Sequence, residues 1–265
     1  MSRTWNHWLV AAAVLFSAAS GPLTASGAEE KPEPDQVAPE KEWSVDLDMT
    51  HNSKYVWRGI NVNNDPVFQP SATFAWKGLS LNVWGNMDLT NVNGNRREVN
   101  EVDYTLSYAG SAGKVNYGFG AVHYAFPNTG FAATTELFAS VGLDVPLAPT
   151  LTVNRDVDEI DGCYAAFALS HTVEKAVTFS ETASMDVDLS ASLGWGDSDH
   201  NNGYFGVRSS APVDLTMGLE LPIAIGDHVT VTPGVHYSNM IDGKIARGAG
   251  RKTNLWTGLS VTFSF

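Results

Sequence analysis

The stretch MDVDLSASLGW, residues 185–195, alternates between two kinds of side chain. Methionine, valine, leucine, alanine and tryptophan occupy its odd positions, and aspartate, serine and glycine occupy the even ones. Successive side chains of a β-strand point to opposite faces of a sheet, so this period of two predicts a strand with one apolar and one polar face. Its length exceeds the usual five or six residues of a strand in a soluble domain.

The same alternation recurs from Trp43 to the end of the chain. Tight connections such as KG, GSAG, PLAP and AIGD, with one longer exception at about 174–183, take turns with longer polar loops. An even number of long strands joined in this way is typical of an outer-membrane barrel. We therefore predict an all-β fold, a closed antiparallel transmembrane β-barrel of about 12 strands over residues 43–265. The predicted strands are 43–58, 66–76, 79–89, 98–109, 114–126, 134–145, 150–157, 162–173, 184–195, 205–222, 228–240 and 252–265.

A soluble closed barrel, such as a lipocalin-like carrier, also alternates and is the main competing fold. The chain ends in GLSVTFSF, which places apolar side chains on one face and a terminal aromatic residue, Phe265. A closed sheet satisfies its own backbone in lipid and leaves no edge. Both features favour the membrane barrel, and we expect Phe265 to contact the barrel-assembly machinery.

The first 28 residues have the pattern of a secretory signal peptide. Arg3 supplies the positive charge, WLVAAAVLFSAA forms a short apolar run, and Ser26 and Ala28 are the small residues of a cleavage site. Residues 29–42 are acidic and proline-rich, so we expect a solvated periplasmic leader. The sequence thus predicts export to the bacterial outer membrane, with cleavage after Ala28.

Composition excludes several classes of partner. The formal net charge of the whole chain is −13, which argues against nucleic acid because phosphate binding requires a basic surface. Cys163 is the only cysteine, so there is no disulfide scaffold. The stretch DSDHNNG, 197–203, begins like a calcium loop but has its glycine one residue late and lacks the final glutamate. We expect an ordinary polar surface loop there, and neither a metal nor a cofactor.

Four motifs in the first half of the barrel resemble the TorF-type porin family of bacterial outer-membrane proteins. They are SKYVWRGINVNNDPVFQPS (53–71), GLSLNVWGNMDL (78–89), EVDYTLSYAGSAGKVNYGFGAVHYAFPN (101–128) and TTELFASVGL (134–143). The similarity is good over residues 43 to about 145 and weaker to Phe265. It implies a porin-like role without naming a substrate.

The first strand places its charged residues inside the barrel. An arginine facing lipid costs about 2–4 kcal/mol at the bilayer centre, so the face that carries Lys54 and Arg58 is predicted to point inward. Tyr55 and Trp57 are then expected in an outer aromatic belt. Arg58 either forms an ion pair inside the wall, with Glu101 or Asp103, or lines the pore.

The same rule places many carboxylates on inward faces, several of them at the periplasmic end. Acidic rings favour cations in a narrow pore, although these groups can equally pair with Lys or Arg or only keep the rim hydrated. Trp84 and Trp256 also face inward, where they either stack on a sugar or fill space. The candidate pore-lining residues are Asp46, Asp48, Lys54, Arg58, Asp88, Glu101, Asp103, Glu136, Asp144, Asp186, Asp188 and Glu220.

The predicted function is a channel for the passive passage of small polar solutes, with a weak preference for cations. The alternative is a non-conducting structural or scaffold barrel, which a sealed lumen would favour. A barrel enzyme is a weaker reading, because His123, His171 and His236 belong to no spaced Ser-His-acid signature. The predicted partners are outer-membrane lipid, small solutes and the assembly machinery, and the oligomeric state stays open.

Overall fold

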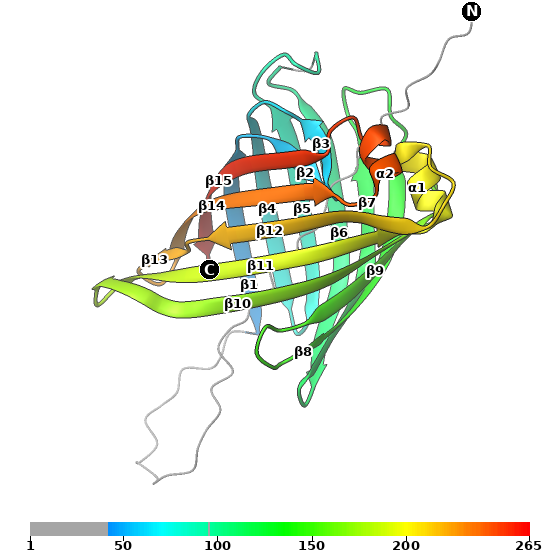
Figure 1. Cartoon of the computed structure of the whole chain (residues 1–265). Helices are drawn as coiled ribbons and strands as arrows, with labels where there is room; N and C mark the ends of the chain where they lie inside the picture. The colour runs from blue at the N-terminus through cyan, green and yellow to red at the C-terminus, as the bar shows by residue number, and fades with distance from the viewer. Residues whose placement is uncertain (1–41, 95) are drawn as a thin grey trace, which may run out of the picture.

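The computed structural model describes residues 42–94 and 96–265. The expected signal peptide, and all of the expected leader except Glu42, lie outside these residues. The described chain forms a closed antiparallel β-barrel (Figure 1). Its wall strands are β1 (Trp43–Asn52), β4 (Val67–Trp76), β5 (Leu79–Asp88), β6 (Val99–Ala112), β7 (Val115–Ala125), β8 (Thr134–Leu143), β9 (Thr150–Asp156), β10 (Cys163–Ser180), β11 (Ala183–Gly196), β12 (Ala211–Glu220), β13 (Ile223–Ile225), β14 (Val229–Met240) and β15 (Thr253–Ser264).

These segments make 12 wall strands, as the sequence predicts. The short β13 continues β12, because both segments pair with β11 on one side and with β14 on the other. Neighbours in the sequence are neighbours in the sheet, and β15 pairs with β1 to close it, with Met49 opposite Val261. Closure removes the free strand edges that would otherwise carry unpaired backbone groups.

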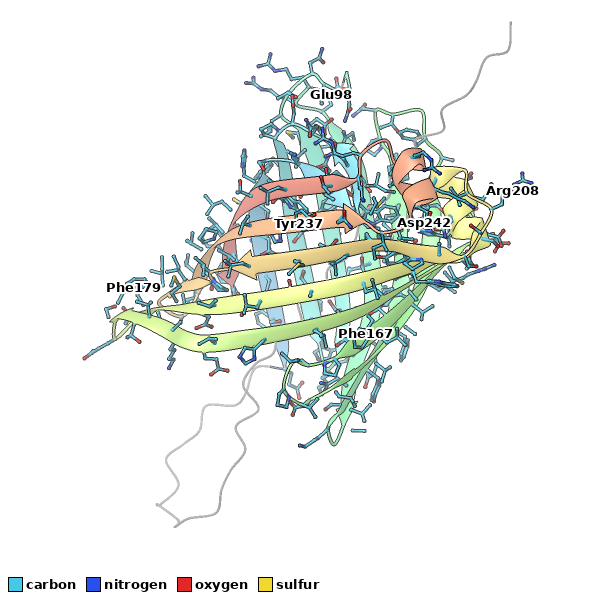
Figure 2. The ribbon with its side chains drawn as sticks, in the orientation of Figure 1. Glu98, Phe167, Phe179, Arg208, Tyr237 and Asp242 are labelled. Atoms are coloured by element: carbon cyan, nitrogen blue, oxygen red, sulfur yellow. The ribbon has the colours of Figure 1, made fainter. Side chains whose placement is uncertain are left out.

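The alternation in the sequence becomes an apolar outside and a polar inside. Met49, Leu106 and Leu255 are 52%, 60% and 62% exposed although their side chains are apolar. Phe167, Phe179 and Tyr237 likewise project away from the ribbon in Figure 2. The outer face is the apolar band that a lipid-facing barrel requires. None of the helices in the described ranges is long and apolar enough to cross a membrane.

The two ends of the barrel differ, and we name them by their connections. The turn end holds the start of β1, the end of β15 and short turns such as Lys77–Gly78. The loop end holds longer connections and two short helices, α1 (Ser198–Phe205) and α2 (Gly243–Gly248), which contact each other. Asp197 and Asp242 cap these helices by accepting hydrogen bonds from backbone N–H groups of the first turn.

Three sequence predictions are corrected here. The connection expected at 174–183 is strand up to Ser180, because a bulge between Val173 and Val177 lets β10 continue past Glu174 and Lys175. The stretch 197–203 is mainly helix, since Asp197 starts α1 instead of a polar loop. The first strand ends at Asn52 instead of residue 58.

The residues after Asn52 turn back as a hairpin of β2 (Tyr55–Trp57) and β3 (Ile60–Asn63). The two residues of its turn, Arg58 and Gly59, have φ of 44° and 79°. Positive φ at both positions is the geometry of a type I′ turn, which matches the natural twist of a two-stranded hairpin. The hairpin is thus an element separate from the barrel wall.

Candidate functional site: the lumen and its hairpin plug

The hairpin β2–β3 is held in the lumen by an ion pair between Arg58 and Glu136 of β8. The Arg58 nitrogens Nη1 and Nη2 donate hydrogen bonds of 2.8 and 2.7 Å to the two carboxylate oxygens of Glu136. The hydroxyl of Tyr124 donates a third hydrogen bond to Glu136, at 3.0 Å. The side chains of Arg58 and Glu136 are 6% and 3% exposed. A bidentate, buried pair of this kind fixes both position and orientation.

The guanidinium of Arg58 also lies between two aromatic rings. Its central carbon is 4.4 Å from the ring centre of Trp57 and 4.3 Å from that of Tyr164. The hydroxyl of Tyr164 donates to Asp214 at 2.8 Å, which fixes the ring. Burial alone would lower the pKa of Arg58, but the charge and hydrogen bonds of Glu136 raise it above its usual value. Arg58 is therefore a permanent cation held on three sides.

Further contacts seat the rest of the hairpin against the wall. Asn61 donates to the Asn254 side-chain oxygen at 3.0 Å, and Asn254 donates to the Gly59 carbonyl at 3.1 Å. The Tyr55 ring lies 5.8 Å from Trp84, and the Trp57 ring lies 5.1 Å from Tyr204 of α1. These partners come from β15, β5 and α1, so the hairpin is surrounded by the barrel. We call residues 54–63 the plug.

The loop-end half of the lumen is a packed core. Trp57, Met240 and Ile245 are fully buried there, together with Val67 and Val213. The plug, α1 and α2 supply much of this apolar material, and the wall supplies the rest. A barrel of this size needs more than wall side chains to fill it. The plug fills it at this end.

Two expectations about the first strand are wrong, because the chain turns back after Asn52 and places the hairpin inside the lumen. Tyr55 and Trp57, expected in an outer aromatic belt, are 5% and 0% exposed inside the lumen. The partner of Arg58 is Glu136, not Glu101 or Asp103. Those two carboxylates are buried near Tyr55 instead, and together with burial their charges raise its pKa well above the usual value. Apolar and polar side chains continue to alternate through the hairpin. The alternation that placed Arg58 inside therefore could not reveal the turn.

The turn-end half of the lumen is lined by polar side chains that stay partly exposed. Asp48 of β1 accepts hydrogen bonds from Ser71 at 3.0 Å and Thr262 at 2.6 Å. Asp188 accepts from Thr172 at 2.6 Å and lies opposite Glu220 in the sheet. Hydroxyl donors therefore hold two of these carboxylates, Asp48 and Asp188, without neutralising them.

The other predicted acidic residues of this end are less uniform. Asp46 shares the inward face of β1 with Asp48, whereas Asp144 is exposed in the turn after β8. Asp186 accepts a hydrogen bond of 2.7 Å from the backbone N–H of Lys175. Glu220 lies 3.6 Å from Nε2 of His236. The structure thus brings five carboxylates to the inner wall and leaves Asp144 at the rim.

Basic side chains are distributed unevenly between the two ends. Within residues 42–94 and 96–265, the Lys and Arg residues at the turn end are Lys77 and Lys114 in turns and Lys175 at the bulge of β10, and all three are exposed. Every other described Lys and Arg lies at the loop end, and there Arg58 is the buried one. The inner wall of the turn-end half is consequently acidic.

The remaining predicted residues also have defined positions. Asp88 is buried at the loop end and accepts hydrogen bonds from Asn86 and Asn93, while Lys54 is half-buried before β2. Trp84 packs on the plug, and Trp256 stacks on His236 with ring centres 5.1 Å apart. Both tryptophans face inward, as parity predicts. Sequence reasoning missed Tyr124, Tyr164 and Asp214, which lie on inward parity but carry no local motif.

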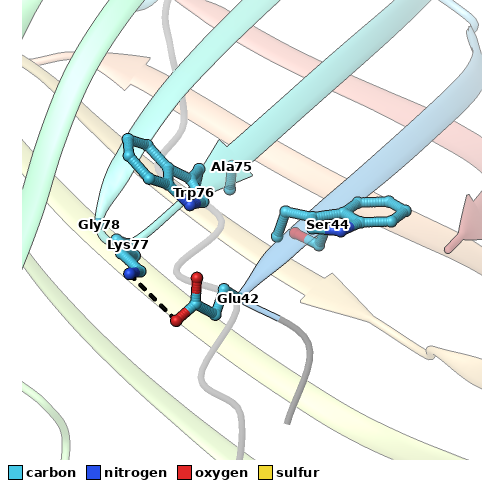
Figure 3. A pocket seen from close by; sticks show the side chains of 7 residues that line it. Glu42, Ser44, Ala75, Trp76, Lys77 and Gly78 are labelled. Atoms are coloured by element: carbon cyan, nitrogen blue, oxygen red, sulfur yellow. Dashed lines mark ion pairs between the residues drawn. The ribbon is translucent and has the colours of Figure 1, made fainter. Parts of the chain in front are cut away.

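A shallow hollow at the turn end marks the boundary of the barrel wall. It is lined by Trp43 and Trp76, which lie opposite each other on β1 and β4, and by Lys77, Gly78 and Glu42 (Figure 3). Lys77 Nζ is 3.0 Å from the Glu42 carboxylate. Exposed tryptophans beside a cation are typical of a membrane–water interface.

Comparisons with known proteins give matches among solved structures alone. No family model and no curated protein matches the chain. Among solved structures, the NanC porin is 11% identical with a TM-score of 0.46, covering 83% of this chain and 98% of the other. A bacterial polysaccharide outer-membrane secretin is 12% identical with a TM-score of 0.45, covering 83% and 98%. OprB of Pseudomonas putida is 10% identical with a TM-score of 0.35, covering 78% and 61%.

Proposed function

We propose that this protein is a porin-like channel of the bacterial outer membrane that passes small polar solutes. A closed barrel with an apolar outside and a polar inside suits a lipid bilayer, because its backbone needs no external partner. The turn end would face the periplasm and the loop end the exterior. The motifs that resemble the TorF-type porins support the same class. Phe265, 51% exposed beside the start of β1, is available to the assembly machinery.

One observation carries the proposal: the lumen is closed by a separate hairpin and not by the wall alone. The turn-end half keeps partly exposed polar side chains, whereas the loop-end half is blocked by residues 54–63. We expect that removal of this one segment would open a path along the lumen past α1 and α2. A non-conducting scaffold would also have a packed loop end, so the test must separate the two.

The acidic inner wall gives the channel a weak preference for cations. Asp46, Asp48, Asp186, Asp188 and Glu220 face the lumen at one end, without a Lys or Arg on the described inner wall beside them. Like charges at a mouth with low-dielectric walls focus the local field and raise the local concentration of counter-ions. The proposed solutes are therefore small and polar, with cations favoured over anions.

The test is planar-bilayer conductance of the wild type and of a variant in which residues 54–63 are replaced by a Gly-Ser linker of the same length. We expect low or intermittent conductance for the wild type and a larger, steady conductance for the variant. A matched control replaces residues 128–132, an exposed loop at the same end, and should behave like the wild type. A folded plug variant that does not conduct would establish the scaffold alternative.

A further inference from the structure

The guanidinium of Arg58 occupies a pocket whose other walls belong to the barrel. Glu136 of β8 provides the carboxylate, Tyr124 of β7 orients it, and Tyr164 of β10 covers one face of the guanidinium. Asp214 of β12 fixes Tyr164. We call these four residues the guanidinium pocket. They sit on wall strands and form two hydrogen-bonded pairs, Tyr124 with Glu136 and Tyr164 with Asp214, neither of which includes a plug residue.

The chemistry of this pocket selects a planar, forked cation. Two hydrogen bonds of 2.8 and 2.7 Å run from separate nitrogens to separate carboxylate oxygens. An aromatic face 4.3 Å from the central carbon suits a flat, weakly hydrated ion. An ammonium group is a compact point charge that cannot form the fork or stack in the same way. The pocket therefore matches a guanidinium better than a lysine-like cation.

An empty pocket of this kind would be unfavourable. Glu136 is 2% exposed and Asp214 is 2% exposed, so both carboxylates lie away from bulk water. A buried carboxylate that loses its partner keeps the cost of its desolvation without compensation. When Arg58 leaves, the site attracts another cation, and the acidic turn-end lumen is the adjoining source of cations.

We propose that the guanidinium pocket binds small solutes that carry a guanidinium group, and that Arg58 is its intramolecular ligand. A solute in the pocket and Arg58 in the pocket exclude each other, so binding of the solute releases the plug. A group tethered by a short linker has an effective concentration on the order of millimolar, and a free solute must exceed this level to compete. Binding of a guanidinium group by this pocket does not depend on channel function, whereas its use as a site for solutes rests on the channel proposed above.

The test removes the internal ligand and supplies a free one. Purified Arg58→Ala protein in mild detergent is titrated with methylguanidinium, and the midpoint of thermal unfolding and the tryptophan fluorescence are recorded. We expect a saturable rise of the midpoint at millimolar concentrations, because methylguanidinium fills the vacated site. Methylammonium at the same ionic strength should act at least tenfold more weakly. The wild type, whose pocket is occupied, should respond only at higher concentrations.

A second variant tests whether the pocket itself is responsible. Adding Glu136→Gln to Arg58→Ala should abolish the response, because the carboxylate that accepts both hydrogen bonds is gone. If Arg58→Ala does not fold, the Gly-Ser variant of residues 54–63 presents the same wall residues and takes its place. Equal responses to methylguanidinium and methylammonium, or a response that survives Glu136→Gln, would overturn the inference.

The outcome is separable from the fate of the channel. A variant that binds methylguanidinium but does not conduct keeps the binding site and rejects the channel. A variant that conducts but shows no saturable response to methylguanidinium keeps the channel and rejects the site.

Discussion

At the scale of single residues, the position of the plug depends on one buried pair of opposite charges. The ion pair of Arg58 and Glu136 joins residues 78 positions apart in the chain and is shielded from water by Trp57 and Tyr164. Such a pair is costly to break, because the surviving charge keeps no partner. Its energetic value is therefore best measured with both single and double variants.

Glu136→Gln should lower the free energy of unfolding by about 3–5 kcal/mol, the usual cost of removing one partner of a buried ion pair. The double variant Arg58→Met, Glu136→Gln should recover part of this loss, because no unpaired charge remains. Urea unfolding of the protein in lipid vesicles, followed by tryptophan fluorescence, measures both. Equal destabilisation in the single and double variants would show that the charges are not coupled.

His200 of α1 should make the folded state sensitive to acid. Burial and, second, the positive charge of Arg58 lower the pKa of His200 to about 3, although the hydrogen bond with Asn201 and the charges of Asp197 and Asp156 act in the opposite direction. The unfolded chain takes up a proton near pH 6.5 while the folded chain does not. The contribution of His200 to the free energy of unfolding is therefore fully present above about pH 6.5. It falls by about 1 kcal/mol per pH unit as the pH drops towards 3.

This dependence is measured by urea unfolding at pH 7.5 and pH 4.5. His200→Phe is the matched control, because it keeps an aromatic ring beside Tyr164 and Tyr204 but cannot be protonated. The loss of stability between the two pH values should be smaller in this variant than in the wild type. The same loss in both proteins would assign the acid sensitivity to other residues.

At the scale of elements, the wall is predictable and the interior is not. The period of two identifies all 12 wall strands, because lipid outside and water inside impose opposite polarity on alternate side chains. The plug has protein on all sides, so no such boundary marks it, and its alternation joins smoothly onto that of β1. Its turn carries arginine before Gly59, where asparagine or aspartate would have been the usual signal.

In the candidate site too, one part could be predicted from the sequence and another part could not. Parity places Arg58, Glu136 and Trp84 inside, and they are inside. Which inward residues meet depends on how far each strand lies around the barrel and on the reversal at Gly59, and neither follows from local sequence. The pairing of Arg58 with Glu136, a residue 78 positions away, therefore could not be predicted from the sequence.

Gly59→Ala should unseat the plug. A Cβ at this position would lie 2.6 Å from Met240 Sδ and 2.7 Å from Asp214 Cβ, and the φ of 79° already disfavours a side chain. We expect a conductance above that of the wild type and faster proteolysis within residues 54–63. Gly94→Ala is the matched control, because Gly94 has a φ of 87° but nothing within 4 Å of the Cβ that alanine would add. If both variants behave alike, backbone strain and not the seating of the plug is responsible.

At the scale of the whole molecule, the described basic residues are concentrated at one end of the barrel, whereas carboxylates occur at both. Carboxylates line the turn-end lumen, and the described basic residues lie mainly at the loop end. This arrangement gives the lumen a polarity along its axis. In the proposed channel, an ion that enters from the turn end would meet the acidic wall before it reaches the plug.

Replacing Asp46, Asp48, Asp186 and Asp188 by Asn in the Gly-Ser plug variant should reduce the preference for cations. The lost carboxylates no longer hold cations near the wall. Reversal potentials under a salt gradient measure the change. A control with four exposed loop-end carboxylates neutralised should shift the reversal potential less: Glu98, Asp158, Glu159 and Asp199. A pore that prefers anions, or an Asn variant that matches its parent, would contradict an acidic selectivity region.

The plug follows directly after β1, and β1 can complete its pairing only when β15, the last strand, has been synthesised. Ser53 N–H bonds to the carbonyl of Thr257, and Asn254 holds the carbonyl of Gly59 across 195 positions of sequence. During synthesis, residues 54–63 therefore emerge early and find their final partners only when β15 arrives. The plug is thus attached to the same pair of strands, β1 and β15, whose pairing closes the barrel. The lumen is consequently obstructed from the moment the barrel is complete, because the contacts that close the sheet also seat the plug.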